Sequence, residues 1–350
     1  MQYVFAMLAL LVTNLGCAVS AQPLWHLGEP LAYMTAHTPA DAIAKRAQLI
    51  QAVWGAPTPH LPVIVNTFPG TGYGGELAPT YFGRTPATSI WLAFTMENNV
   101  WARTYYATFP GSTCLIIVNG GHEEGFFNTL GLPKYSIPGV DALVRSLAGK
   151  PCDIILNSMP LQGENRFAAA YLNIPPDGPT THDQLALLKP ATGSPLKYFL
   201  GPALASLNYA LSQRSYDKIG ALGISGGGWT TSMLAAIEPR IQRSYAVAGS
   251  VPMEFRSAVS EGDWEQRSVP FSYLDVYAMS VADLGRKSFL FYNGKDPCCF
   301  QMDSVTPWAE PLTSVLASFP SEFGAYILYS ASAHDIQPPV ADFILNDLAQ

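Results

Sequence analysis

The chain has 350 residues, of which 49% are hydrophobic and 13% are charged, and its formal net charge at pH 7 is −7. The charged share is about half of the roughly 25% that is usual for globular domains, which argues against a disordered chain and against a solvated helical repeat. Because the net charge is negative and no basic block occurs, we expect neither nucleic acid nor an anionic membrane surface as a partner.

A short hydrophobic stretch opens the sequence, over residues 3–12. It is too short to span a bilayer, which takes about 20 residues. The small residues Val19-Ser20-Ala21 precede Gln22 and are typical of a signal-peptidase site. We therefore expect residues 1–21 to be a signal peptide and the chain to be secreted or periplasmic. A buried N-terminal helix is the alternative, since no Lys or Arg precedes the stretch. Cys17 raises the further alternative of a lipoprotein, but the residues before it form a poor lipobox.

The cysteines that follow the predicted signal peptide are even in number: Cys114, Cys152, Cys298 and Cys299. In an exported chain this indicates disulfides, and four cysteines permit three pairings. Cys114 and Cys152 each begin a predicted strand, so they come within bonding distance if those strands are neighbours. Cys298 and Cys299 are then an adjacent pair or two free thiols, and buried, unpaired cysteines are the alternative for all four.

Two segments of the N-terminal part differ in pattern. Residues 38–41 combine an N-cap threonine with a proline and an aspartate, hydrophobic residues then recur at helical spacing, and Gly55 ends the predicted helix. Residues 55–87 are rich in Pro, Gly and Thr, which favours a long loop or meander. We treat residues 22–88 as an N-terminal extension of a single domain that covers residues 22–350.

The remainder alternates between short hydrophobic strands and helices. Residues 89–96 and 100–109 predict an antiparallel hairpin. Further strands are predicted at 114–118, 152–156, 219–224, 244–248, 288–292 and 325–329, and helices at 139–148, 203–213, 228–237, 307–318 and 338–348. Such alternation indicates βαβ units. We predict an α/β fold whose mostly parallel sheet has about eight strands, an N-terminal antiparallel hairpin and helices on both faces. The proline-rich stretch 157–198 is predicted to be a cap-like insertion.

The motif that carries chemistry is Gly223-Ile224-Ser225-Gly226-Gly227, which lies between a predicted strand and a predicted helix. A serine is a weak nucleophile until a tight turn presents its hydroxyl to a base. Strand, G-x-S-x-G and helix together are typical of a nucleophile elbow, with glycines that let the chain pass close to itself. Ser225 is therefore the predicted nucleophile.

Polar residues at the carboxyl ends of later strands supply the partners that a catalytic serine needs. His334 directly follows the last predicted strand and is the predicted base. Asp296 follows the strand 288–292 and is the predicted acid, although Asn-Gly-Lys-Asp-Pro is also good turn chemistry. Glu254 and Asp263 are the main competing acids, and Asp303 is a weaker one.

The loop after strand 114–118, Asn119-Gly120-Gly121-His122, is predicted to face the serine. The backbone N–H groups of Gly226 and of Gly121 or His122 then form the predicted oxyanion hole. Glu123 and Glu124 are adjacent and favour a solvated turn over a glycosidase pair. Trp229 is a candidate substrate contact. No paired CxxC occurs and the six histidines are scattered, so no metal site and no cofactor are expected.

These motifs, in the chain order Ser225, Asp296, His334, resemble the α/β-hydrolase superfamily over roughly residues 89–350. The stretch 234–241 also resembles secreted carbohydrate esterases. Asn119 departs from the His-Gly-Gly loop of many esterases. The resemblance implies an α/β-hydrolase fold and a serine esterase that acts through an acyl-enzyme, on a small or carbohydrate-borne ester. A prolyl-oligopeptidase-type peptidase, a lipase and a non-catalytic binding protein of the same fold are the alternatives.

Overall fold

The computed structural model describes residues 29–71, 78–122, 125–127, 138–150, 152–166, 179, 181–256 and 262–350. The predicted signal peptide 1–21 lies outside these residues, as do Glu123, Glu124 and residues 167–178 of the predicted insertion. Within the described ranges, no helix is both long enough and hydrophobic enough to cross a membrane.

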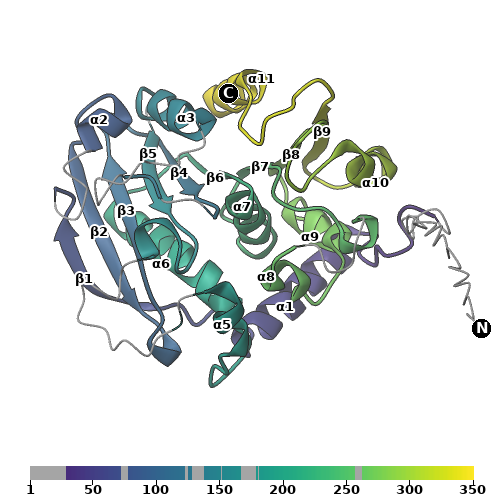
Figure 1. Cartoon of the computed structure of the whole chain (residues 1–350), viewed down its shortest axis with the longest axis horizontal. Coiled ribbons are helices and arrows are strands. Elements are labelled where there is room, and N and C mark those ends of the chain that lie inside the picture. The colour runs from purple at the N-terminus through teal and green to yellow at the C-terminus, as the bar shows by residue number, and fades with distance from the viewer. Residues whose placement is uncertain are drawn as a thin grey trace, which may run out of the picture.

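A nine-stranded mixed sheet organises the fold, in the order β1-β2-β3-β5-β4-β6-β7-β8-β9 (Figure 1). Pairs β1/β2, β2/β3 and β3/β5 are antiparallel, and all other neighbours are parallel. The strands are β1 (Val63–Pro69), β2 (Thr88–Thr95), β3 (Trp101–Thr108), β4 (Cys114–Asn119), β5 (Cys152–Asn157), β6 (Lys218–Ile224), β7 (Arg243–Val247), β8 (Lys287–Asn293) and β9 (Glu322–Leu328).

The ninth strand is the one that the sequence did not predict. β1 lies in the segment that was expected to be a loop or meander, and it extends the predicted hairpin of β2 and β3 by one strand. Most of its residues are exposed, because it forms the outer edge of the sheet. An exposed edge strand lacks the alternation of buried and polar residues by which strands are found.

Helices cover both faces of the sheet, as predicted. In Figure 1, α3 and α11 lie on one face, and α6, α7 and α9 lie on the other. The helices are α1 (Pro39–Trp54), α2 (Ala78–Phe82), α3 (Pro138–Ala148), α5 (His182–Leu187), α6 (Lys197–Gln213), α7 (Gly226–Ile237), α8 (Trp264–Arg267), α9 (Tyr273–Ser280), α10 (Met302–Leu316) and α11 (Pro338–Ala349). Both α6 and α10 begin earlier than predicted, because each continues through a proline (Pro202 and Pro307) near which we expected it to start.

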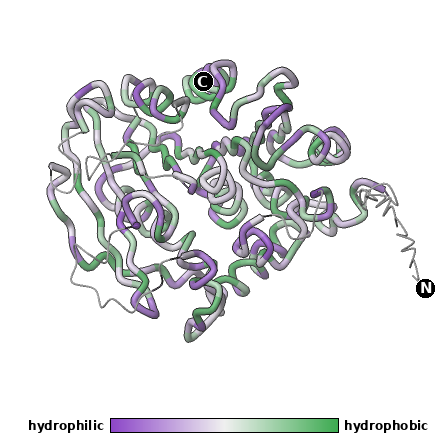
Figure 2. The backbone as a smooth tube through the Cα atoms, in the orientation of Figure 1, coloured by the Kyte–Doolittle hydropathy of each residue, from purple (hydrophilic) through white to green (hydrophobic). Residues whose placement is uncertain are grey.

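The core lies between these layers. Every residue of β4 and β5 is buried, and Figure 2 shows hydrophobic residues along the central strands. A strand that is covered on both faces is hydrophobic throughout, which is why these strands were predicted from short continuous hydrophobic runs. Their carboxyl ends are therefore held rigidly at one edge of the sheet.

The buried side chain of Arg46 connects helix α1 to α7 and α9. Nε of Arg46 donates to the carbonyl of Ala236 at the end of α7 (2.7 Å), and Nη2 donates to the carbonyl of Met279 in α9 (2.6 Å). The same guanidinium pairs with Asp283 (2.6 Å). The N-terminal helix is thereby an integral part of the layer that contains α7.

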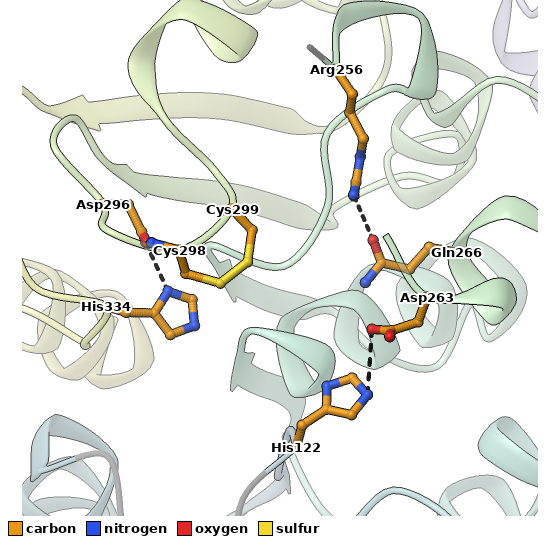
Figure 3. The surroundings of a disulfide bond; sticks show 8 residues. All are labelled: His122, Arg256, Asp263, Gln266, Asp296, Cys298, Cys299 and His334. Atoms are coloured by element: carbon orange, nitrogen blue, oxygen red, sulfur yellow. Dashed lines mark hydrogen bonds and ion pairs between the residues drawn. A yellow bond between two sulfur atoms is a disulfide. The ribbon is translucent and has the colours of Figure 1, made fainter. Parts of the chain in front are cut away.

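The four cysteines form two disulfides. Cys114 and Cys152 are direct register partners at the start of β4 and β5, with Cα atoms 4.5 Å apart. Cys298 is bonded to its neighbour Cys299 in the loop after β8 (Figure 3). The alternative of buried, unpaired cysteines therefore does not apply.

Candidate active site

Ser225 lies in a strained turn between β6 and α7. Its backbone has φ 57° and ψ −130°, a conformation that residues other than glycine rarely adopt. Such a conformation raises the energy of the folded state by roughly 1–3 kcal/mol. The turn is also tight: a Cβ at Gly227 would lie 2.0 Å from the carbonyl oxygen of Asn119, and one at Gly223 would lie 2.5 Å from the carbonyl carbon of Gly227. Both glycines are therefore required by close approach of the backbone.

Neighbouring strand ends hold this turn in place. The N–H of Ser225 donates to the carbonyl of Val247 at the end of β7 (3.0 Å). The side chain of Asn119 donates to Thr231 in α7 (3.0 Å) and accepts from Asn157 at the end of β5 (2.8 Å). Three strand ends thus brace the elbow, which is how its unfavourable backbone conformation is maintained.

The structure brings Asp296 and His334 together. Nδ1 of His334 and Oδ2 of Asp296 are 2.8 Å apart (Figure 3). Asp296 is 1% exposed, and its Oδ1 accepts from the backbone N–H of Cys298 at 2.8 Å. A carboxylate can only accept, so Nδ1 carries the hydrogen and Nε2 of the neutral ring carries the lone pair. Nε2 is buried and forms no hydrogen bond within the described part of the chain.

The loop that carries His334 is held from both sides. The amide of Asn293, the last residue of β8, donates to the carbonyls of Ala333 and Asp335, each at 2.8 Å. The carboxylate of Asp335 accepts from the backbone of Gly139 in α3 (2.9 Å) and so serves a different partner from its neighbour His334. These contacts fix the imidazole at the carboxyl end of β9.

The competing acids lie at other places. Asp263, the N-cap residue of α8, faces Nε2 of His122 at 3.4 Å. Glu254 is in the short helix Met253–Phe255, where burial raises the pKa of its carboxyl. Asp303 is exposed in the first turn of α10. Of the four predicted acids, Asp296 is the one that is hydrogen-bonded to His334.

The predicted oxyanion loop lies against the elbow. Gly226 is the first residue of α7, so its N–H has no acceptor inside the helix. A Cβ at Gly226 would lie 3.0 Å from the ring of His122, which places the imidazole beside the first turn of α7. Gly121 is buried, and the loop is anchored by the buried carboxylate of Glu164, which accepts from the backbone of Phe127 (2.8 Å).

Comparisons with solved structures decide the architecture. Methylesterase BT1017 superposes with a TM-score of 0.54 at 16% identity, over 90% of this chain and 62% of its own length. Acetyl xylan esterase 1 from Thermoanaerobacterium superposes at 0.52 and 12% identity, over 89% of this chain and 94% of its own. Acylaminoacyl peptidase from Pyrococcus horikoshii superposes at 0.51 and 12% identity, over 78% of this chain and 43% of its own.

The chain has the α/β-hydrolase fold. It spans less than two thirds of the methylesterase and of the peptidase. No model of a known protein family matches the sequence, and no curated protein matches it in sequence. The identities with the superposed structures are 12–16%, so the likeness is one of fold.

Trp229 has a different place from the one that was expected. Its side chain is 0% exposed, and its Nε1 donates to the hydroxyl of Tyr273 at 2.7 Å. The indole packs edge-on against Phe199, with ring centroids 5.6 Å apart. Trp229 therefore belongs to the packing beneath the elbow, and it offers no surface to a substrate.

A polar cluster that sequence reasoning missed lies beside the elbow of the α/β-hydrolase fold. Nε2 of His122 is 3.2 Å from Nδ1 of His182, and Oε1 of Glu265 is 3.4 Å from the latter and 3.7 Å from the former. Glu265 is 0% exposed. Burial opposes its ionisation, but the facing imidazoles of His122 and His182 outweigh this and lower the pKa of its carboxyl to about 2. The three residues are far apart in sequence, so no local sequence motif predicts the cluster.

A hollow of about 540 Å³ is present at another part of the surface, and it is unrelated to this site. Its lining includes Lys287 and Glu322, the first residues of β8 and β9. Asp296 and His334 follow the last residues of the same two strands, so the hollow lies at the opposite edge of the sheet.

Proposed function

We propose that this chain is a serine hydrolase of carboxylic esters, with Ser225 as nucleophile, His334 as base and Asp296 as acid. The observation that carries the proposal is the state of His334, whose Nδ1 is held by a buried carboxylate while its buried Nε2 has no hydrogen-bond partner among the described residues. A lone pair kept in this condition is suited to accept a proton from a serine hydroxyl. The elbow at Ser225 supplies that hydroxyl at the edge of the same sheet.

The proposed reaction proceeds in two stages. Ser225 attacks the acyl carbon as His334 takes its proton, and the N–H of Gly226 together with that of Gly121 or His122 stabilises the oxyanion. His334 then protonates the departing alcohol, leaving an acyl-enzyme. Water then attacks the acyl carbon as His334 takes its proton, and His334 passes this proton to the Ser225 oxygen as the bond between serine and the acyl group breaks and the acid leaves. Each oxyanion donor contributes about 10²–10³ in turnover in such sites, and no metal or organic cofactor takes part in these steps.

Esters are proposed as substrates because an esterase is matched over a larger share of its own length than a peptidase is. The acetyl xylan esterase is matched over 94% of its length, whereas the acylaminoacyl peptidase is matched over 43%. We propose that the substrate is a small or carbohydrate-borne acyl ester. We also propose that the protein is secreted or periplasmic, because residues 1–21 have the pattern of a signal peptide. A peptidase, a lipase and a non-catalytic binding protein are the functions that the experiment must separate from this one.

The deciding experiment compares the mature protein with its Ser225→Ala variant on a short-chain p-nitrophenyl ester, on a long-chain ester and on a peptide p-nitroanilide. Ser212→Ala is the matched control, because Ser212 lies on the exposed side of α6. A fluorophosphonate probe reports on the nucleophile independently of substrate choice.

We expect short-chain ester turnover and probe labelling in the wild type and in Ser212→Ala, and loss of both to background in Ser225→Ala. Faster turnover of the anilide or of the long-chain ester would replace the proposal by a peptidase or a lipase. A wild type that neither turns over any substrate nor reacts with the probe would favour a binding protein.

A further inference from the structure

The cluster of His122, His182 and Glu265 joins three separate parts of the chain. His122 lies in the loop after β4, His182 is the first residue of α5, and Glu265 is in α8. Their facing atoms, Nε2, Nδ1 and Oε1, are separated by 3.2, 3.4 and 3.7 Å. The mechanism proposed above uses none of these side chains, so their convergence requires its own explanation.

Hydrogen bonding alone does not satisfy the cluster. Nε2 of His182 lies 2.8 Å from the carbonyl oxygen of Pro160. A carbonyl only accepts, so Nε2 carries the hydrogen and Nδ1 of the neutral ring carries a lone pair. Nε2 of His122 lies 3.2 Å from this lone pair and can donate one hydrogen to it. Oε1 of Glu265, 3.4 Å from the same Nδ1, has only lone pairs to offer.

The buried carboxylate of Glu265 requires a compensating positive charge. Both of its carboxylate oxygens are buried, and neither accepts a hydrogen bond of good geometry from a described residue. A carboxylate in that state is costly unless a cation compensates it. Asp263 adds a second carboxylate, with Oδ2 3.4 Å from Nε2 of His122 (Figure 3). Two imidazoles and the carboxylate of Glu265 thus bring potential ligand atoms within 4.8 Å of one another, with Asp263 beside His122.

The spacing matches a tetrahedral metal ion. Zinc bonds to histidine nitrogen and carboxylate oxygen are about 2.0–2.2 Å long, which puts neighbouring ligand atoms of a tetrahedron about 3.3–3.5 Å apart. The distances of 3.2, 3.4 and 3.7 Å come within about 0.2 Å of the edges of one face of such a tetrahedron. The contact of His182 with the carbonyl of Pro160 is the kind of outer bond that orients a metal-binding imidazole.

We propose that His122, His182 and Glu265 bind a divalent transition-metal ion, zinc before others, with water as the fourth ligand. Two imidazoles and a carboxylate favour zinc over magnesium or calcium, which prefer oxygen ligands throughout. The side chains of His122 and Asp263 are 32% and 48% exposed, so the ion has a path from solvent. Bound there, it would pin the loop after β4 beside Gly226. This departs from the expectation, drawn from scattered histidines, that the chain has no metal site.

The experiment measures metal directly, so its outcome does not depend on the proposed esterase activity. Full-length protein is stripped with a chelator and titrated with zinc chloride by calorimetry, and bound zinc is counted by elemental analysis. Cobalt(II) is used as a second probe, because its visible absorption reports tetrahedral coordination. The variants are His182→Ala and Glu265→Gln, with His37→Ala as an exposed-histidine control.

A further variant, His334→Ala, separates this cluster from a second group of potential ligand atoms in Asp296, Cys298 and His334. We expect about one zinc per chain in the wild type, His37→Ala and His334→Ala, a tetrahedral cobalt spectrum, and at least about 100-fold weaker binding in His182→Ala and Glu265→Gln. The proposal is overturned if the wild type binds no zinc, if folded Glu265→Gln binds it as tightly as the wild type, or if His334→Ala abolishes binding.

Discussion

Replacing Asp296 by asparagine tests how the buried carboxylate acts on His334. The carboxylate accepts two hydrogen bonds, from Nδ1 of His334 and from the backbone N–H of Cys298, both at 2.8 Å. An asparagine side chain has one oxygen, so it can serve only one of these two donors. The amide NH₂ must face the other.

The two orientations have different consequences. If the NH₂ faced Cys298, two donors would oppose each other, and the peptide N–H cannot give up its hydrogen. If it faces His334, the imidazole can adapt by moving its hydrogen from Nδ1 to Nε2. The second orientation is therefore preferred, and it removes the lone pair that accepts the proton of Ser225 in the proposed mechanism. We expect kcat/KM to fall by about 10⁴ with the fold retained, since the wrong tautomer alone has an effect of that size in a serine triad.

The assay is kcat/KM on a short-chain p-nitrophenyl ester, beside circular dichroism of each protein. Asp303→Asn is the matched control, since Asp303 is exposed in the first turn of α10, and it should retain wild-type activity. The reasoning fails if folded Asp296→Asn loses less than tenfold, because His334 would then be oriented by something other than the carboxylate.

Two further substitutions test how the fold supports the site. Asp283→Asn leaves the buried guanidiniums of Arg46 and Arg286 without their carboxylate, and we expect a loss of about 2 kcal/mol, between the values for exposed and buried pairs, because Asp283 is 32% exposed. Gly227→Ala places a Cβ 2.0 Å from the carbonyl oxygen of Asn119, and we expect loss of both soluble yield and activity.

Urea unfolding measures the loss of stability in Asp283→Asn, with the exposed Asp342→Asn as control. The deficit should shrink in acid. Burial raises the pKa of Asp283, but Arg46 and Arg286 outweigh it and lower the pKa of the folded state. The stabilisation is then complete above the unfolded value of about 3.9 and disappears as pH falls through the lowered value. A deficit that is constant down to pH 2 contradicts the ion-pair explanation, and a normally active Gly227→Ala protein contradicts the packing of the elbow.

Much of the sheet was predictable because its central strands are buried on both faces and interrupted by amphipathic helices. The elements that were missed lack such a signal. All eight residues of α9 are buried, so it has no polar face from which a helical period can be recognised, and α8 has only four residues. Strand β1 fails for the opposite reason, since most of it is exposed.

The candidate site divides in the same way. The elbow is local in sequence, and Asp296 and His334 were predicted because each directly follows a strand. The cluster of His122, His182 and Glu265 depends on the tertiary arrangement of a loop and two short helices that are far apart in sequence. The spacing of the three residues in the sequence therefore does not predict that they meet. The pairing of Cys114 with Cys152 needed the register of β4 and β5, which two isolated strand patterns do not contain.

The bond between Arg46 and Asp283 also sets an order of events during synthesis. These residues are 237 positions apart, and ribosomes add about 5–20 residues per second, so α1 waits roughly 10–50 s before its partner has been made. During that interval α7 (Gly226–Ile237) and α9 (Tyr273–Ser280), to which the guanidinium also donates, are made one after the other. Arg46 can therefore complete its contacts only after residue 283 of 350 has been added, and any chain that stops before Asp283 lacks the carboxylate that pairs with Arg46.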